Sequence, residues 1–160
     1  MMSLILSIST LIGFVLFLLF FFKANTGVIF LAACAGLVLL QSLDPVVVSA
    51  AGAVVPSEGE AYVKLLVVLL SMVFAAMMFR NSVKPSQFIM HAILAVVTGL
   101  MLWLVLPEST GLSWLIDVTR EPIWQNLKDY ETLVVSLGFS LSLLTVLMHK
   151  AHTHRKHAKN

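Results

Sequence analysis

Four histidines near the C-terminus form the most distinctive chemical pattern in the chain. His149, His152, His154 and His157 follow the spacing H-x-x-H-x-H-x-x-H. On a continuous helix the first two would share one face and the last two another, because residues three apart are neighbours. Neutral imidazoles suit zinc, copper or nickel, so a metal site is one interpretation. Against it, structural zinc sites use four ligands held by a fold, and a short tail offers little scaffold.

The same tail is cationic, which supports a different interpretation. Lys150, Arg155, Lys156 and Lys159 lie among the histidines. A cation beside an anionic membrane surface contributes about 1 kcal/mol, and histidine protonation below about pH 6.5 would strengthen that contact. We therefore expect residues 149–160 to bind anionic lipid, with partner docking and metal binding as alternatives.

Two ionisable residues beside or within apolar stretches are candidates for moving a proton or an ion. Asp44 precedes Pro45 and the short apolar segment 46–55. If that segment dips back into a membrane, Asp44 would face a water-filled cleft, where intramembrane charges are commonly functional. His91 could shuttle a proton, since its unperturbed pKa is about 6.5. The alternatives are a helix-ending aspartate before a proline and an interfacial histidine bonded to a carbonyl.

Familiar catalytic patterns are missing from the sequence. It contains no G-x-x-x-x-G-K-[ST], G-x-S-x-G or H-E-x-x-H motif, and no apolar segment carries a ladder of arginines. The single cysteine, Cys34, lies in an apolar run and cannot form an intrachain disulfide. We expect no enzymatic activity, no cofactor and no nucleic-acid partner.

The composition predicts that these residues are positioned by membrane-spanning helices. The chain has 160 residues, of which 59% are hydrophobic and 11% charged, and its mean hydropathy is +0.99. Soluble domains carry about 25% charged residues, and a small one cannot bury this much apolar surface. The apolar runs are about 16–20 residues long without alternation, which favours helices over tilted strands. We predict an all-α bundle of five spans, with four spans as the alternative. The five-span version places them at about 3–22, 28–43, 61–79, 87–106 and 132–148.

The segments between the spans complete one transmembrane domain, residues 1–148, followed by the tail. Thr26-Gly27 is expected to form the turn of a hairpin between the first two spans, and Pro107-Glu108 to end the fourth. Residues 46–55 are too few to cross about 30 Å of hydrocarbon, so we expect an interfacial or re-entrant piece. Residues 112–129 predict two short amphipathic turns on the membrane surface, interrupted at Pro122.

Small residues four apart predict where helices approach closely. The first span, rich in Phe and Leu, is instead expected to face lipid. The small-residue pairs are Ala32 and Gly36, Ala95 and Gly99, and Ser136 and Ser140.

Charge predicts the orientation of five spans. Seven of the ten Lys and Arg fall on one side, which the positive-inside rule places in the cytoplasm. All eight acidic residues, and all the Trp and Tyr, fall toward the other side. The N-terminus is then outside and the C-terminus cytoplasmic. The seven cations are Lys23, Arg80, Lys84, Lys150, Arg155, Lys156 and Lys159.

Two functional classes follow. The first is a non-enzymatic accessory or scaffold subunit that docks a membrane protein through Trp114 and Trp124 or through the tail. The second is a small oligomeric transporter or channel subunit that uses Asp44 and residues 46–55. In size and hydrophobic topology the chain resembles small bacterial inner-membrane proteins such as the colicin V production family, although no motif residue is shared.

Overall fold

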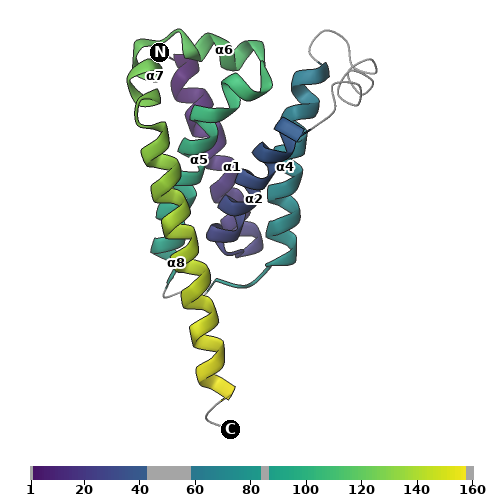
Figure 1. Ribbon diagram of the computed structural model, residues 1–160, viewed down its shortest axis with the longest axis vertical. Helices are drawn as coiled ribbons and strands as arrows, with labels where there is room; N and C mark the ends of the chain where they lie inside the picture. Colours follow the sequence, from purple (N-terminus) through teal and green to yellow (C-terminus); the bar gives the residue numbers. More distant parts are fainter. Residues whose placement is uncertain (1, 43–58, 84–86, 158–160) are drawn as a thin grey trace.

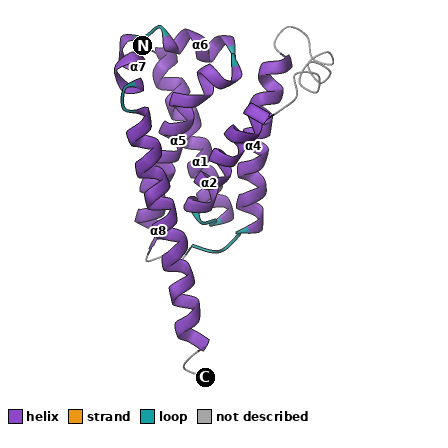
Figure 2. Ribbon diagram, viewed as in Figure 1, coloured by secondary structure: helices purple, strands orange, loops and turns teal. Residues whose placement is uncertain are grey.

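The computed structural model describes residues 2–42, 59–83 and 87–157, and within them the chain is helical without strands (Figure 2). Asp44 and residues 46–55 lie outside these ranges. The helices are α1 (Met2–Phe22), α2 (Thr26–Ser42), α4 (Gly59–Met78), α5 (Phe88–Thr110), α6 (Ser113–Thr119), α7 (Pro122–Lys128) and α8 (Glu131–His157).

Three of these helices, α1, α4 and α5, are long and apolar enough to cross a membrane. A fourth candidate is the pair formed by α7 and residues 131–147 of α8, which meet at a bend of 56°. Helix α2 has 17 residues and is a shorter apolar helix. The described chain thus holds three to four candidate membrane-spanning helices, and the five-span count is not confirmed.

The long helices alternate in direction along the bundle (Figure 1). Helices α1, α4 and α8 run from the end that carries α6 and α7 toward the opposite end, and α2 and α5 run back. Helix α8 extends beyond the bundle at that opposite end, so the described N-terminal and C-terminal residues lie at different ends.

The packing partners differ from the predicted hairpin of the first two spans. Helix α1 packs mainly against α5, while α2 packs mainly against α4 and also against α5 and α8. The connection between α1 and α2 is Lys23–Asn25, and Thr26 and Gly27 already belong to α2. The predicted turn at Thr26-Gly27 therefore lies a few residues after the observed connection.

Helix α1 does not simply face lipid as expected. Leu11, Val15 and Leu18 are buried at helical spacing, whereas Phe17 and Phe20 are more than half exposed. A Cβ added at Gly99 of α5 would lie 2.7 Å from Ile12 Cα. The glycine therefore permits the close crossing of α5 over α1. This agrees with the close helix approach predicted from the small residues Ala95 and Gly99.

A side-chain hydrogen bond reinforces the same crossing. Trp103 is fully buried on α5, and its indole Nε1 donates to Ser7 Oγ of α1 at 3.1 Å. The ring lies in the core between the two helices, where a buried indole N–H needs an acceptor.

The small residues of α2 contact α4, in agreement with their predicted packing role. Ser71 Oγ donates to Ala32 O at 3.0 Å, and a Cβ at Gly36 would lie 3.1 Å from Val68 Cα. In α8, by contrast, Ser136 and Ser140 are exposed. The buried face of α8 is offset by two residues and contains Gly138, which contacts Phe30, and Ser142.

The sequence predicts that the fourth apolar helix ends at Pro107, but the structure shows that it does not. Helix α5 continues through it to Thr110 and ends at Gly111, whose φ of 75° is left-handed and whose N–H donates to Pro107 O at 3.2 Å. A proline removes one backbone donor, and the left-handed glycine closes the final turn without it.

Candidate functional site

The C-terminal tail contains most of the candidate residues predicted from the sequence. Helix α8 continues to His157, so the tail is helical over most of its length. The side chains of His149, Lys150, His152, His154, Arg155, Lys156, His157 and Lys159 are outside the described set. Among the side chains that are described, no group of three or more His, Cys, Asp and Glu gathers as a metal site.

His91 is buried in the first turn of α5, with 3% of its surface exposed. It lines a niche of about 10 Å³ together with Gln87, Met90 and Thr145, so α5 and α8 both contribute. A volume of about 10–15 Å³ accommodates one water molecule. The imidazole is thus an interior group between two helices rather than an exposed interfacial one.

Further buried polar residues lie at the same end of the bundle. Asn25 is the last residue of the α1–α2 connection and Thr26 the first of α2, while Ser142 and Thr145 come from α8. A Cβ at Gly27 would lie 2.9 Å from Ser142 O and would collide with Thr145 Oγ1. Glycine at this position therefore lets α2 and α8 meet here. We call Asn25, Thr26, His91, Ser142 and Thr145 the basal polar cluster.

Two connections are joined by hydrogen bonds next to this cluster. Asn81 N–H donates to Phe22 O at 2.9 Å, and Val83 N–H donates to Lys23 O at 3.0 Å. Asn25 N–H also donates to Ser82 Oγ at 2.9 Å. Lys23 and Asn81 adopt left-handed φ angles of 49° and 59°, a strained conformation for a lysine. The α1–α2 and α4–α5 connections therefore form one interlocked base.

Most buried hydroxyls bond to their own helices. Thr98 Oγ1 donates to Leu94 O, Ser142 Oγ to Gly138 O and Thr145 Oγ1 to Ser142 O, all at 2.7–2.8 Å. Thr26 Oγ1 is the exception in this group, since it is fully buried with no hydrogen-bond partner among the described residues. The cluster could hold a water or exchange a proton locally, but the rest of the buried core consists mainly of Leu and Ala.

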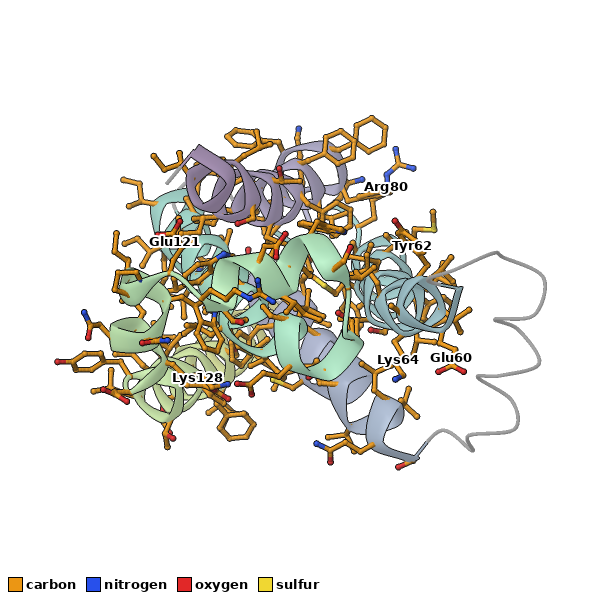
Figure 3. All side chains as sticks on the ribbon, turned by 90° about the horizontal axis from the view of Figure 1, so that it is seen from above. Glu60, Tyr62, Lys64, Arg80, Glu121 and Lys128 are labelled. Atoms are coloured by element: carbon orange, nitrogen blue, oxygen red, sulfur yellow. The ribbon has the colours of Figure 1, made fainter. Side chains whose placement is uncertain are left out.

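The opposite end is covered by α6 and α7, which form a second organised region. Figure 3 looks onto this end, with Glu121 and Lys128 on the side of α6 and α7, and Glu60, Tyr62 and Lys64 on the side of α4. Lys128 Nζ donates to Glu108 Oε2 of α5 at 2.8 Å and pairs with Glu131 of α8. One ammonium therefore joins the ends of three helices. We call residues 113–128 the cap.

The charge of Lys128 is stabilised in this position. Partial desolvation lowers the pKa of Lys128, but hydrogen bonds to Glu108 and Glu131 and their negative charges outweigh it, so the pKa is raised. The ammonium also lies 5.4 Å from the centre of the Trp124 ring, within the range of a cation–π contact.

The two tryptophans predicted to contact a partner have different environments. Trp124 is 6% exposed and packs inside the cap, whereas Trp114 is 42% exposed. A contact with another protein at this end would therefore use Trp114, with Trp124 holding the cap together.

Comparisons with protein-family models, with curated proteins and with solved structures give no match for this chain.

His91 is a candidate from the sequence, but the polar residues around it are not. Thr145 and Ser142 lie in an apolar run where a hydroxyl carries no signal of its own, and Thr26 was expected to form a turn with Gly27. The pairing of Lys128 with Glu131 could have been found from their spacing of three residues. Its pairing with Glu108, 20 residues away, requires the fold.

Proposed function

We propose that the chain is a multi-pass membrane protein of five spans, with the N-terminus outside and the C-terminus in the cytoplasm. The loops around Lys23 and Arg80 lie together at the end from which α8 projects, which supports one cation-rich side. Helix α2, at 17 residues, is about 26 Å long and equals the shortest usual span. A bacterial inner membrane is the proposed location.

Within that membrane we propose a non-enzymatic scaffold or accessory role. The observation that carries it is the cap, which is fixed to α5 and α8 through Lys128 and presents apolar side chains. Trp114, Ile116 and Ile123 are 42%, 38% and 43% exposed. A rigid surface with an exposed tryptophan is suited to docking another protein, because aromatic anchors dominate interface energies.

The distribution of polar groups supports a scaffold over a transport pathway. The basal polar cluster is confined to one end, and most of its hydroxyls are satisfied by their own helices. Ion and proton pathways need ionisable groups along the span. The alternative is an oligomeric transporter that uses Asp44 and residues 46–55, with His91 as a second titrating group. The burial of His91 beside a water-sized niche favours that alternative.

The test is purification of the intact protein in gentle detergent or nanodiscs, followed by mass spectrometry and native mass determination. We expect a second protein at fixed stoichiometry that can be reconstituted from purified components. Trp114→Ala should weaken this complex by about 2 kcal/mol or more if Trp114 is an anchor. Gln125→Ala, at an exposed polar position of the cap, is the matched control and should leave it unchanged. A variant lacking residues 149–160 tests the tail.

A lone homo-oligomer would contradict the scaffold. In that case Asp44→Asn should abolish flux in proteoliposomes while the fold persists. If Asp44→Asn leaves the flux unaffected, a transport mechanism that uses Asp44 is excluded.

A further inference from the structure

Two cationic residues from different connections lie together at the end of the bundle from which α8 projects. Lys23 lies in the α1–α2 connection, and Arg80 lies just after α4. Asn81 N–H donates to Phe22 O, and Val83 N–H donates to Lys23 O, so the two backbones run side by side here. Both cationic side chains are exposed, and Figure 3 shows Arg80 at the outer edge of the bundle. The fold therefore brings an ammonium and a guanidinium to one part of the surface.

No described carboxylate neutralises these two cations. The acidic residues that the structure describes belong to the opposite end, at the start of α4, at the end of α5, and in or beside the cap. At that end the cations Arg120 and Lys128 each lie within 4.0 Å of a carboxylate. Lys23 and Arg80 have no such partner among the described residues. An anion from outside the protein can therefore approach both cations without displacing a carboxylate of the described chain.

Exposed phenylalanine rings border the two cations. On α1, Phe17 and Phe21 stack with 5.3 Å between their ring centroids and are 55% and 67% exposed. Phe21 lies two residues before Lys23, and Phe17 lies one turn further into the candidate span. In the other connection, Phe79 directly precedes Arg80 and is 46% exposed. An apolar surface thus begins at the cations and continues along α1. A free phosphate ion would use only the cations, whereas a phospholipid would use both the cations and this surface.

The two cations offer complementary contacts to a phosphate group. A guanidinium can donate two parallel hydrogen bonds to two phosphate oxygens, and an ammonium acts as a point charge. The backbone of Lys23 is held by its hydrogen bond to Val83 and adopts a left-handed φ of 49°. Because the two backbones are already fixed, less ordering is needed when an anion binds, which favours affinity.

From this juxtaposition we propose that Lys23 and Arg80 bind the phosphate of one anionic phospholipid in the leaflet at this end of the bundle. The phosphate lies between the ammonium and the guanidinium, and one acyl chain follows Phe17 and Phe21 along α1. The site rests on the proposed membrane location but not on a protein partner, so it is tested on the purified chain alone.

The experiment is native mass spectrometry of the delipidated full-length protein titrated with phosphatidylglycerol or with phosphatidylcholine of the same chains. We expect the first phosphatidylglycerol to bind more tightly than the first phosphatidylcholine. Arg80→Gln should lower the affinity for phosphatidylglycerol about fivefold, as expected for one cation beside an anionic lipid. Arg120→Gln removes the same charge from an exposed arginine that lies next to Asp117. It is the matched control and should bind as the wild type does.

A second variant removes the other cation. Lys23→Asn should also lower the affinity for phosphatidylglycerol about fivefold. Asparagine is chosen because it is enriched in the left-handed conformation that position 23 adopts. Since the side chains of Lys23 and Arg80 are exposed, both variants should keep the unfolding midpoint of the wild type, so that a loss of lipid reports on the site.

Three outcomes would contradict the proposal. Wild-type affinity for phosphatidylglycerol in both Arg80→Gln and Lys23→Asn would overturn the site. An equal loss of phosphatidylcholine binding would overturn the preference for an anionic head group. Glycerophosphoglycerol, the same head group without acyl chains, should not displace the lipid at equal concentration, and displacement would overturn the role of the acyl chain. The titration contains no second protein, so failure of this site leaves the scaffold role standing, and absence of a protein partner leaves this site standing.

Discussion

Trp103 shows how one side chain can fix the position of the N-terminal helix. Its ring is fully buried and its Nε1 donates to Ser7, 96 residues earlier in the chain. Apolar packing alone distinguishes poorly between helix orientations in lipid, because lipid is as apolar as the helix surface. A directional hydrogen bond between α1 and α5 selects one arrangement.

Trp103→Phe should lower the free energy of unfolding by about 1–2 kcal/mol, because it removes both the hydrogen bond and part of the buried ring. The measurement is the thermal unfolding midpoint in one fixed detergent. Trp114→Phe, at a 42% exposed position, is the control and should have little effect. Equal shifts in the two variants would contradict a special role for Trp103.

Two glycines provide a second residue-scale test. Gly99→Ala should destabilise the fold by about 1–3 kcal/mol, because its Cβ would lie 2.7 Å from the Ile12 backbone and α1 would have to move. Gly13→Ala on α1 meets nothing within 4 Å and should be neutral or slightly stabilising. The comparison uses the same unfolding assay, and an equally harmless Gly99→Ala would show that α1 and α5 are not in close contact.

The sequence predicts only some of the small residues at which helices make close contact, for a physical reason. Gly99 and Gly36 were found because small residues four apart permit close packing wherever they occur. Ser136 and Ser140 have the same spacing but face outward, and Gly138 packs instead. In a uniformly apolar helix neither face is marked by polarity, so spacing alone cannot choose between them.

At the scale of helices, the cap depends on Lys128. Lys128→Met should loosen residues 113–128 by about 1–2 kcal/mol, since hydrogen bonds from a charged donor to two carboxylates are lost. Hydrogen exchange in the cap should then accelerate about 5–30-fold. Arg120→Met removes an exposed pair with Asp117 at 4.0 Å and serves as the control, since such pairs contribute about 0–1 kcal/mol. An unchanged cap in Lys128→Met would mean that apolar packing around Trp124 is sufficient.

The raised pKa of Lys128 gives the cap a defined response to alkali. A lysine whose folded pKa exceeds its unfolded value, about 10.4, contributes its full stability below that pH and loses it as the pH rises through the folded pKa. The near-ultraviolet circular dichroism of the tryptophans should therefore stay constant through neutral and mildly alkaline pH and change in strong alkali. The Lys128→Met protein should lack that step, and a change near neutral pH would exclude Lys128 as its cause.

The helical elements were more predictable than their contacts. The predicted spans 3–22 and 61–79 nearly coincide with α1 and α4, because about 20 apolar residues between polar ends define a helix in lipid. The end of α5 was misplaced because Pro107 is tolerated one turn before Gly111. The basal polar cluster could not be predicted, since it depends on how α2, α5 and α8 meet.

For the whole molecule, the number of spans determines where the two termini lie. Five spans place the termini on opposite sides of the membrane and four spans place them on the same side. In a Cys34→Ser background, a single cysteine introduced at Ser113 of the cap should react with an impermeant maleimide from outside. A cysteine at Thr153 should react only after the membrane is opened, and a fusion at the N-terminus should be accessible from outside. Labelling of both termini from one side would contradict the five-span topology.

The pairing of α1 with α5 also has a consequence for how the chain is made. Helix α1 is synthesised first, but its main neighbour is completed only at Thr110, with α2 and α4 produced in between. At about 5–20 residues per second, α1 waits about 4–18 s before α5 is complete. During that interval Ser7, Ile12 and the face bearing Val15 are open to other newly inserted helices. The N-terminal helix is therefore the part of the nascent protein most exposed to mispairing, and the part for which a membrane chaperone would matter most.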